Sequence, residues 1–474
     1  MKIVMLGSEA NPFVKTGGLA DVIFALSDEL VKKGEEVSVF LPFYNQVKAK
    51  VIDAEFMTRV DVEMSWRRPS ANILKTVVDG ISFYFVENQQ YFEREHLYGY
   101  DDDGERFAFF SLAVIKAMEA LNMQVDIIHL HDWQVGMVPC VIKENRIPLF
   151  KKTKFVITIH NPAFLGIIDR YSLGDLYNLP DYLYSNGTAR YYDKVSTLKS
   201  GIVYADKVTT VSPNHRQELL TPEGGNGLNN VLIYKEYDFC GFLNGIDYEE
   251  FNPEKDSYLV ANYNIKNFVE GKKKNKEALC ERLGLDNKEA PMFALVSRLT
   301  WQKGISLVIQ AIHEMVARGA NVVVLGSGEY EYEQDFEYLH ALYPNKVSIY
   351  IGFSNELAHQ IYASSDFFMM PSLFEPCGLG QMIAQRYGTL PIVRRTGGLR
   401  DSVICYDGNN AETSNGFGFD AYSVYEMTRT SHYAYDAYND KKLLHQLMRN
   451  AMNTDNSWLK STLEYIKLYK VLVK

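Results

Sequence analysis

Cysteine is scarce and scattered in this chain. Five cysteines occur among 474 residues, and no two of them form a CxxC pair: Cys140, Cys240, Cys280, Cys377 and Cys405. The odd number and wide spacing indicate neither a disulfide framework nor a structural zinc site. A reducing cytoplasm is therefore the expected location.

Long hydrophobic runs and excess positive charge are also missing. No stretch approaches the ~20 apolar residues that span a bilayer, and the apolar run Met1–Leu6 is too short for a signal peptide. The formal net charge is -10, which argues against broad binding to nucleic acid or anionic lipid. We expect no membrane or nucleic-acid partner, and any polymer substrate should be neutral.

Short apolar runs alternate with helix-period segments along the whole chain, which predicts an α/β fold with parallel sheets. The expected strands are Lys2–Leu6, Val37–Leu41, Ser82–Val86, Ile127–Leu130, Phe155–Thr158, Lys207–Val211, Phe293–Val296, Asn321–Leu325, Val347–Ile351, Phe367–Met370 and Leu390–Val393. Asp21–Lys33 and Gly304–Arg318 carry apolar residues on one helical face. This pattern predicts two doubly wound, Rossmann-like halves.

The turn-forming run Leu243–Asp247 is the weak point between the two halves. We therefore expect an N-terminal domain over 1–244, a C-terminal domain over 245–456 and a final amphipathic helix over 457–474. The lysine run Lys272–Lys274 is interpreted as a solvated helix face.

Two strand-to-helix loops carry candidate anion-binding residues. Lys15–Gly18 lies between a strand and a helix, where backbone N–H groups and the helix N-terminus favour an anion. An ordinary strand-to-helix turn would have the same pattern. Two cations of the second half, Arg298 and Lys303, lie on another strand-to-helix loop and could hold a diphosphate. Two ordinary surface charges would give the same sequence pattern.

A single carboxylate, Glu375, lies on a turn bounded by proline and glycine at the end of Phe367–Met370. Ligands of open α/β sheets bind at that end of the strands. Glu375 could be a general base, a nucleophile, an acceptor for sugar hydroxyls or only a helix N-terminal carboxylate. Its neighbour Cys377 is interpreted as a packing residue because no nearby histidine would activate it.

Histidines also end strands. His160 closes one predicted strand, and His129, His131 and Asp132 close another. A histidine there could donate a hydrogen bond to a ligand hydroxyl, could be a half-buried structural ring, or could share a metal. No third metal ligand is evident, so no metal is predicted.

Taken together, these runs resemble the bacterial glycogen synthase and starch synthase family, which are retaining glycosyltransferases of the GT-B fold. The resemblance covers nearly the whole chain. The matching runs, in family order, are KTGGLAD (15–21), LYGYDDDGERFAFFS (97–111), HDW (131–133), TIHN (158–161), KSGIVYADKVTTVSP (199–213), LNGID (243–247), SRLTWQKG (297–304), FEPCGL (374–379) and YGTLPIVRRTGGL (387–399).

The resemblance implies a fold, in which two domains face a central cleft that closes on the ligand and the last helix crosses back to the first domain. It also implies roles for individual residues. The implied catalytic set is Glu375, Lys303, Arg298, His160 and Asp132. The implied donor-binding set is Lys15, Gly17, Gly18, Asp21, Asn244, Cys377, Gly378, Leu379 and Gly380, with Phe353 stacking on the base.

The implied activity is transfer of glucose from a nucleoside-diphosphate glucose to the non-reducing 4-OH of an α-1,4-glucan, with retention and without a cofactor. The bacterial form favours ADP-glucose over UDP-glucose. Gly380 replaces a threonine that is common in the family, and residues 162–165 also depart from its pattern. The alternatives are a glucan phosphorylase, a catalytically inactive glucan-binding protein and a dinucleotide oxidoreductase, although GxGxxG is missing.

Overall fold

The computed structural model describes residues 1–51 and 53–474, and the chain divides into two compact units. Unit 1 contains Met1–Val211, Arg216–Phe242 and Ser461–Lys474, and unit 2 contains Ser212–His215 and Leu243–Lys460. The division falls between residues 242 and 243 and between 460 and 461, whereas the sequence placed it at 244/245 and 456/457. Each unit is built around its own sheet.

The main sheet of unit 1 has nine strands in the order β12-β11-β7-β6-β1-β2-β5-β4-β3. They are β1 (Lys2–Leu6), β2 (Glu36–Pro42), β3 (Glu55–Asp61), β4 (Ser70–Val78), β5 (Ile81–Glu87), β6 (Ile127–His131), β7 (Lys154–Ile159), β11 (Lys207–Thr210) and β12 (Phe239–Gly241). Pairing is parallel from β12 to β5, and β4 and β3 add an antiparallel edge. The chain runs outward from β1 in both directions, so the order of the strands reverses between β1 and β6.

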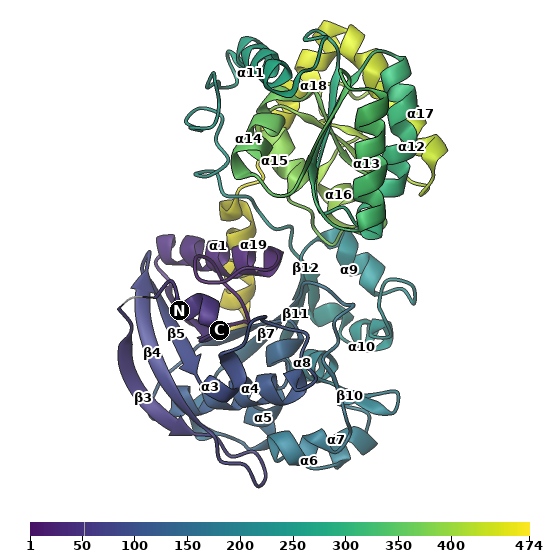
Figure 1. Ribbon diagram of the computed structural model, residues 1–474. Helices are drawn as coiled ribbons and strands as arrows, with labels where there is room; N and C mark the ends of the chain where they lie inside the picture. The colour runs from purple at the N-terminus through teal and green to yellow at the C-terminus, as the bar shows by residue number, and fades with distance from the viewer. Residues whose placement is uncertain (52) are drawn as a thin grey trace. The chain divides into compact units, whose positions relative to one another are not determined.

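Helices cover both faces of this sheet. In Figure 1, α1 and α19 lie next to each other above it, and α4 and α5 lie below it. The helices of unit 1 are α1 (Gly18–Lys32), α2 (Asn45–Lys48), α3 (Gln89–Phe92), α4 (Asp103–Ala120), α5 (Val138–Glu144), α6 (Ser172–Tyr177), α7 (Tyr182–Ser185), α8 (Thr197–Tyr204) and α10 (Asn229–Tyr234), together with most of α9 (Pro213–Leu219) and of α19 (Trp458–Leu472), whose first residues belong to unit 2. A small antiparallel sheet joins β8 (Ile167–Ile168), β10 (Lys194–Ser196) and β9 (Arg190–Tyr191).

Unit 2 has a six-stranded parallel sheet in the order β15-β14-β13-β16-β17-β18. Its strands are β13 (Met292–Val296), β14 (Asn321–Gly326), β15 (Val347–Ile351), β16 (Phe367–Met370), β17 (Leu390–Arg394) and β18 (Phe417–Phe419). Its helices are α11 (Phe268–Leu283), α12 (Ile305–Ala317), α13 (Tyr330–Leu342), α14 (Asn355–Ser364), α15 (Gly380–Arg386), α16 (Gly397–Ser402), α17 (Val424–Asn439) and α18 (Lys441–Asn453). Figure 1 shows α11 and α14 on one side of this sheet and α12, α13 and α17 on the other. Here the order of the strands reverses between β13 and β16.

The end of the chain returns to unit 1 through α19. Inside unit 1, the Tyr469 hydroxyl lies 2.7 Å from Nδ1 of His129 on β6. The Tyr465 ring packs edge-on against Phe242, with ring centroids 4.8 Å apart. Both tyrosine rings and the histidine ring are buried. The segment after residue 460 is therefore part of the core of unit 1.

The lysine run on α11 does not form the solvated face that the sequence suggested. Lys273 and Lys274 are exposed, but Lys272 is only 5% exposed. Its ammonium donates to the carbonyls of Ala363 and Tyr387 and to the Thr389 hydroxyl. The run points in several directions because successive residues on a helix are about 100° apart, and burial lowers the pKa of Lys272 to about 7.

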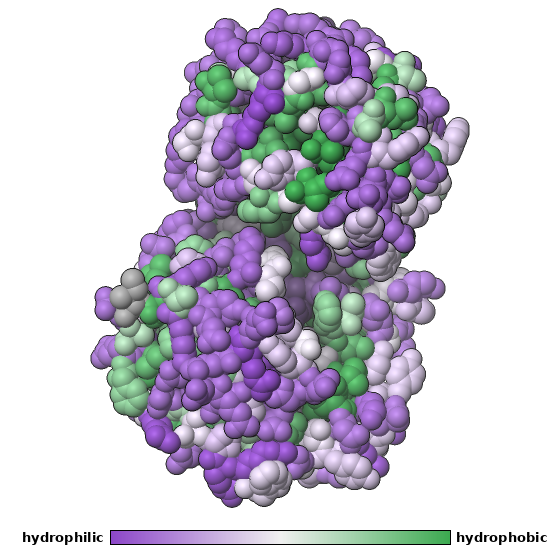
Figure 2. All heavy atoms as spheres, in the orientation of Figure 1, coloured by the Kyte–Doolittle hydropathy of each residue, from purple (hydrophilic) through white to green (hydrophobic). Residues whose placement is uncertain are grey.

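The surfaces seen in Figure 2 are mostly hydrophilic in both units, with scattered apolar side chains. Within residues 1–51 and 53–474, every helix is too short or too polar to be a membrane span.

Candidate active site

The predicted residues of unit 2 gather at the carboxyl ends of β13 and β16, two adjacent parallel strands at the reversal of strand order. Arg298 and Lys303 follow β13, and Glu375 follows β16. This is the position where open α/β sheets bind their ligands. The structure brings Lys303 and Glu375 into contact, with 2.5 Å between Nζ and Oε2, and Ser372 donates to the same oxygen over 3.1 Å.

The Lys303–Glu375 ion pair is largely withdrawn from solvent, since 17% of the lysine side chain and 9% of the glutamate side chain are exposed. Arg298, in contrast, is exposed. No carboxylate lies within ion-pair distance of Arg298 in the part of the chain that the structure describes. Arg298 therefore keeps a positive charge that no carboxylate of the described residues neutralises.

Two glycines of the TGGL run support the turn that carries Glu375. A Cβ atom at Gly397, which has φ +44°, would lie 2.0 Å from the Glu375 carbonyl oxygen. A Cβ atom at Gly398 would lie 2.2 Å from the Cys377 carbonyl oxygen, and the Gly398 N–H donates to the backbone carbonyl of Glu375 over 3.0 Å. Only glycine allows this close backbone approach. The TGGL run thus holds the Glu375 turn in place.

The rest of the turn is braced by the side-chain amide of Gln381 and leads into α15. Gln381 donates to the Cys377 and Gly378 carbonyls over 3.2 and 3.0 Å. Leu379 and Gly380 begin α15, whose first N–H groups have no partner within the helix and are suited to a phosphate.

Cys377 is a buried thiol, and burial raises its pKa to about 12. It is therefore not a thiolate at neutral pH. The backbone N–H of Asn244 contacts this thiol. The side-chain oxygen of Asn244 is buried and has no hydrogen-bond partner among the described residues, so it can accept from a ligand hydroxyl.

Phe353 follows β15 at the same edge of the sheet and is 87% exposed. A phenylalanine that packs against no core in the free protein leaves its ring face open for stacking.

The predicted residues of unit 1 also gather at the carboxyl ends of adjacent strands. The loop of Lys15 follows β1, Asp132 follows β6, and His160 follows β7, and these three strands lie side by side. The reversal of strand order lies between β1 and β6, so this edge is the ligand edge of unit 1 as well.

The glycine loop differs from an empty anion site because Glu9, which the sequence reasoning missed, occupies it. The Glu9 carboxylate is only 4% exposed and accepts from the backbone N–H groups of Thr16 and Gly17, from the Thr16 hydroxyl and from the Tyr98 hydroxyl. The available signal was a carboxylate between a buried strand and a glycine loop. These N–H groups are thus already engaged by the carboxylate of Glu9.

Lys15 is paired as well, with 2.7 Å between its ammonium and Asp21, and the amide of Asn11 donates to the same carboxylate. Gly17 and Gly18 are open, since a Cβ at either would meet nothing within 4 Å. No packing inside the described structure requires glycine there, which leaves room for the close approach of a ligand.

Asp132 has a strained backbone, with φ 61° and ψ -169°. This region is nearly restricted to glycine, and such strain of roughly 1–3 kcal/mol concentrates at functional sites. Its Oδ1 accepts from the His160 N–H over 2.8 Å. Burial raises the pKa of Asp132 to about 7, even though the backbone N–H groups of His160 and Asn161 favour the charged form.

The histidine rings are neutral at pH 7. Burial lowers the pKa of His160 and of His129 to about 3, and that of His131 well below its usual value. His131 contacts His160 directly, with 2.9 Å between ring nitrogens. No three His, Cys, Asp or Glu side chains come together as a metal site within residues 1–51 and 53–474.

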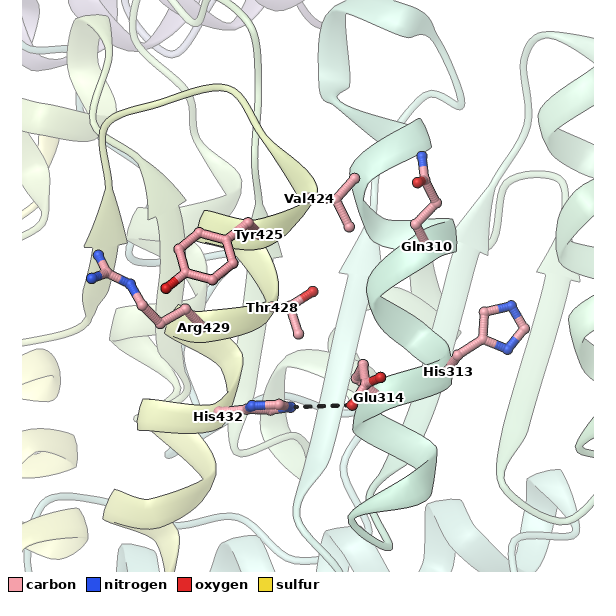
Figure 3. Close-up of a pocket in the computed structure, with 8 residues that line it drawn as sticks. All are labelled: Gln310, His313, Glu314, Val424, Tyr425, Thr428, Arg429 and His432. Carbon is pink, nitrogen blue, oxygen red and sulfur yellow. Dashed lines mark ion pairs between the residues drawn. The ribbon is translucent and has the colours of Figure 1, made fainter.

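A separate groove lies in unit 2 between α12 and α17. Figure 3 shows its lining residues, among them His432 and Glu314, whose side chains approach to 3.9 Å across it. None of the predicted catalytic or donor-binding residues lines this groove. It is distinct from the edge that carries Arg298, Lys303 and Glu375.

Comparison with known proteins shows which family this chain resembles. The family model for the starch synthase catalytic domain matches residues 2–234, and the model for glycosyl transferases group 1 matches residues 276–454. The chain is 44% identical over 478 residues to a glycogen synthase of Bacillus cereus (strain B4264) and 45% identical over 477 residues to one of Streptococcus mutans serotype c. Both matches cover all of each chain.

Solved structures agree with this assignment. The catalytic domain of starch synthase IV from Arabidopsis thaliana, bound to ADP and acarbose, matches with a TM-score of 0.91 and 34% identity, covering 100% of this chain and 99% of the other. A sucrose-phosphate synthase from Thermosynechococcus elongatus shares the fold, with a TM-score of 0.63 at 15% identity over 99% of this chain and 98% of the other. The GT-B fold expected from the sequence is confirmed, and the chain belongs to the glycogen synthase and starch synthase family of hexosyltransferases.

Proposed function

We propose that this protein takes glucose from ADP-glucose and adds it to the non-reducing 4-OH of an α-1,4-glucan with retention of configuration. The names of the full-length relatives support the transfer to a glucan. The Arabidopsis starch synthase, which was solved with ADP and acarbose, supports the adenine nucleotide.

The observation that carries the proposal is the buried Lys303–Glu375 pair beside the exposed Arg298, at the ligand edge of unit 2. Arg298 would bind the diphosphate, with help from the N–H groups at the start of α15. Glu375 would accept from a hydroxyl of the donor sugar, and Lys303 would hold Glu375 in place and add positive charge near the leaving group. Such fixed charges stabilise the charge that develops on the diphosphate.

The cations of the two units differ in whether an internal carboxylate already neutralises them. In unit 1 the ammonium of Lys15 is matched by Asp21, and the N–H groups of the glycine loop are engaged by Glu9. We therefore assign neutralisation of the diphosphate mainly to unit 2. Asp132 and His160 of unit 1, and Asn244 of unit 2, would contact sugar hydroxyls, while Phe353 would stack on the base.

Retention follows from attack on the same face that the diphosphate leaves. The C1–O bond to the phosphate breaks, the acceptor oxygen bonds to C1, and the 4-OH proton passes to the departing phosphate oxygen. A retaining glycosidase would instead need a second carboxylate close to the first. Position 383, which carries a second glutamate in related retaining GT-B enzymes, is a buried isoleucine here.

The test compares kcat/KM for ADP-glucose and UDP-glucose with glycogen as acceptor, and reads the anomeric configuration of the product by NMR. We expect ADP-glucose to be preferred by at least tenfold and the new linkage to be α. A preference for UDP-glucose would contradict the donor assignment, and a β-linkage would contradict retention.

A further inference from the structure

His131 is a buried residue of the HDW motif to which the mechanism above gives no role. It lies at the end of β6 and is fully enclosed. Its Nδ1 lies 2.9 Å from Nε2 of His160, and its own Nε2 is buried without a hydrogen-bond partner among the described residues. The His131 ring also packs against the His129 ring in a tilted arrangement, with centroids 4.3 Å apart and an interplanar angle of 31°.

Only one proton assignment leaves no buried donor unpaired. Both rings are neutral, so each carries one N–H. If His160 donated from Nε2, the N–H of His131 would have to lie on its Nε2, buried and without an acceptor. An unpaired buried N–H is costlier than an unpaired lone pair. The His131 proton therefore lies on Nδ1 and is donated to Nε2 of His160.

This proton assignment decides whether His160 can donate or accept a hydrogen bond to a ligand. Because Nε2 of His160 accepts from His131, the proton of His160 lies on Nδ1. His160 is half-buried, whereas His131 behind it is fully enclosed. The Nδ1–H of His160 is thus a hydrogen-bond donor at the ligand edge of unit 1. It lies next to Asp132, which accepts from the His160 backbone N–H.

We propose that His131 is a positioning residue that fixes His160 in the Nδ1–H tautomer, so that His160 donates a hydrogen bond to a sugar hydroxyl. The inference rests on the proposed sugar-binding role of His160. His131 is held in turn by its ring contact with His129, which is anchored by Thr158 at 2.6 Å and by Tyr469 at 2.7 Å.

The experiment measures the tautomer directly by ¹⁵N NMR of protein labelled at the histidine rings, with the His160 signals assigned by their loss in His160→Gln. In the wild type we expect the proton on Nδ1 of His160. His131→Asn offers an amide N–H close to the position of Nδ1 and should keep this tautomer, while His131→Leu removes the donor and should yield a tautomer mixture. His160 protonated on Nε2 in the wild type would overturn the proposal without any variant.

Kinetics provide the second readout. Loss of one oriented hydrogen bond should lower kcat/KM of His131→Leu by about tenfold, and His131→Asn should stay within about threefold of wild type. Equal activity of His131→Leu and wild type, with His160 still protonated on Nδ1, would refute a positioning role. If the tautomer is fixed but His160→Ala keeps full activity, the sugar-binding role of His160 fails, and with it the function assigned to His131.

Discussion

The contact between Lys303 and Glu375 predicts that the two residues act as one unit. Substituting either one should therefore impair both activity and stability. The pair is 2.5 Å long and mostly shielded from water. At an effective dielectric constant of about 20, two unit charges at that distance attract by roughly 7 kcal/mol before desolvation. Removing one partner leaves the other charge buried and uncompensated, which typically costs about 3–5 kcal/mol, whereas removing both is far cheaper.

We expect Glu375→Ala to lower kcat by about 10²–10⁴ and Lys303→Ala by at least ~10². The double variant should lose no more than the worse single variant, because residues that act as one unit are strongly non-additive. In thermal unfolding each single change should lower the stability of unit 2 by roughly 3 kcal/mol, or about 6–12 °C. The double variant should recover most of that loss.

The assay measures nucleoside-diphosphate release with glycogen as acceptor, alongside thermal melts of all variants. Arg298→Ala is the matched control, since this exposed cation has no carboxylate partner in the described chain. It should lower turnover by at least ~10² and change stability by less than about 0.5 kcal/mol. Losses of kcat that multiply in the Lys303/Glu375 double variant would refute the idea that the pair acts as one unit.

Two further predictions concern single groups. Cys377→Ser should keep substantial activity, because burial raises the pKa of this thiol to about 12 and leaves no thiolate to attack sugar; isolation of a glycosyl-cysteine adduct would overturn this. Asp132 has a pKa of about 7, raised by burial, so kcat/KM should rise through pH 7 as its carboxylate ionises to accept from sugar hydroxyls. The raised pKa also means that Asp132 stabilises unit 1 fully below about pH 4 and that this stabilisation is lost as pH rises through 7. Asp132→Asn should abolish both dependences, and profiles that match wild type would contradict them.

The sequence predicted the central strands well, because strands of a parallel sheet are buried on both faces and form continuous apolar runs. Lys2–Leu6 and Phe367–Met370, which lie inside their sheets, have the same bounds in the structure as in the prediction. The antiparallel edge formed by β3 and β4 was missed, since exposed and buried side chains are mixed along both strands. Edge strands of this kind are too similar to loops in composition to be recognised from the sequence.

Within the candidate site, the sequence predicted which residues end strands but not what they contact. Lys303 and Glu375 are separated by 72 positions, and their pairing depends on β13 and β16 being neighbours. Glu9 was missed for the same reason, because its partners Thr16 and Gly17 are engaged only when the loop folds back on it. Which charged side chains neutralise one another at these strand ends depends on the tertiary structure. A sequence motif shows each charged residue but not its partner.

The return of α19 to unit 1 has a consequence for synthesis in the cell. Residues 461–474 are translated only after all of unit 2, yet Tyr465 and Tyr469 are buried in unit 1 against Phe242 and His129. Domains usually fold as they emerge, the N-terminal one first. Here the first unit emerges with an uncovered apolar face and waits for the whole second unit to be made. A stalled or truncated chain would thus expose that face, which is a ready site for chaperone binding or aggregation.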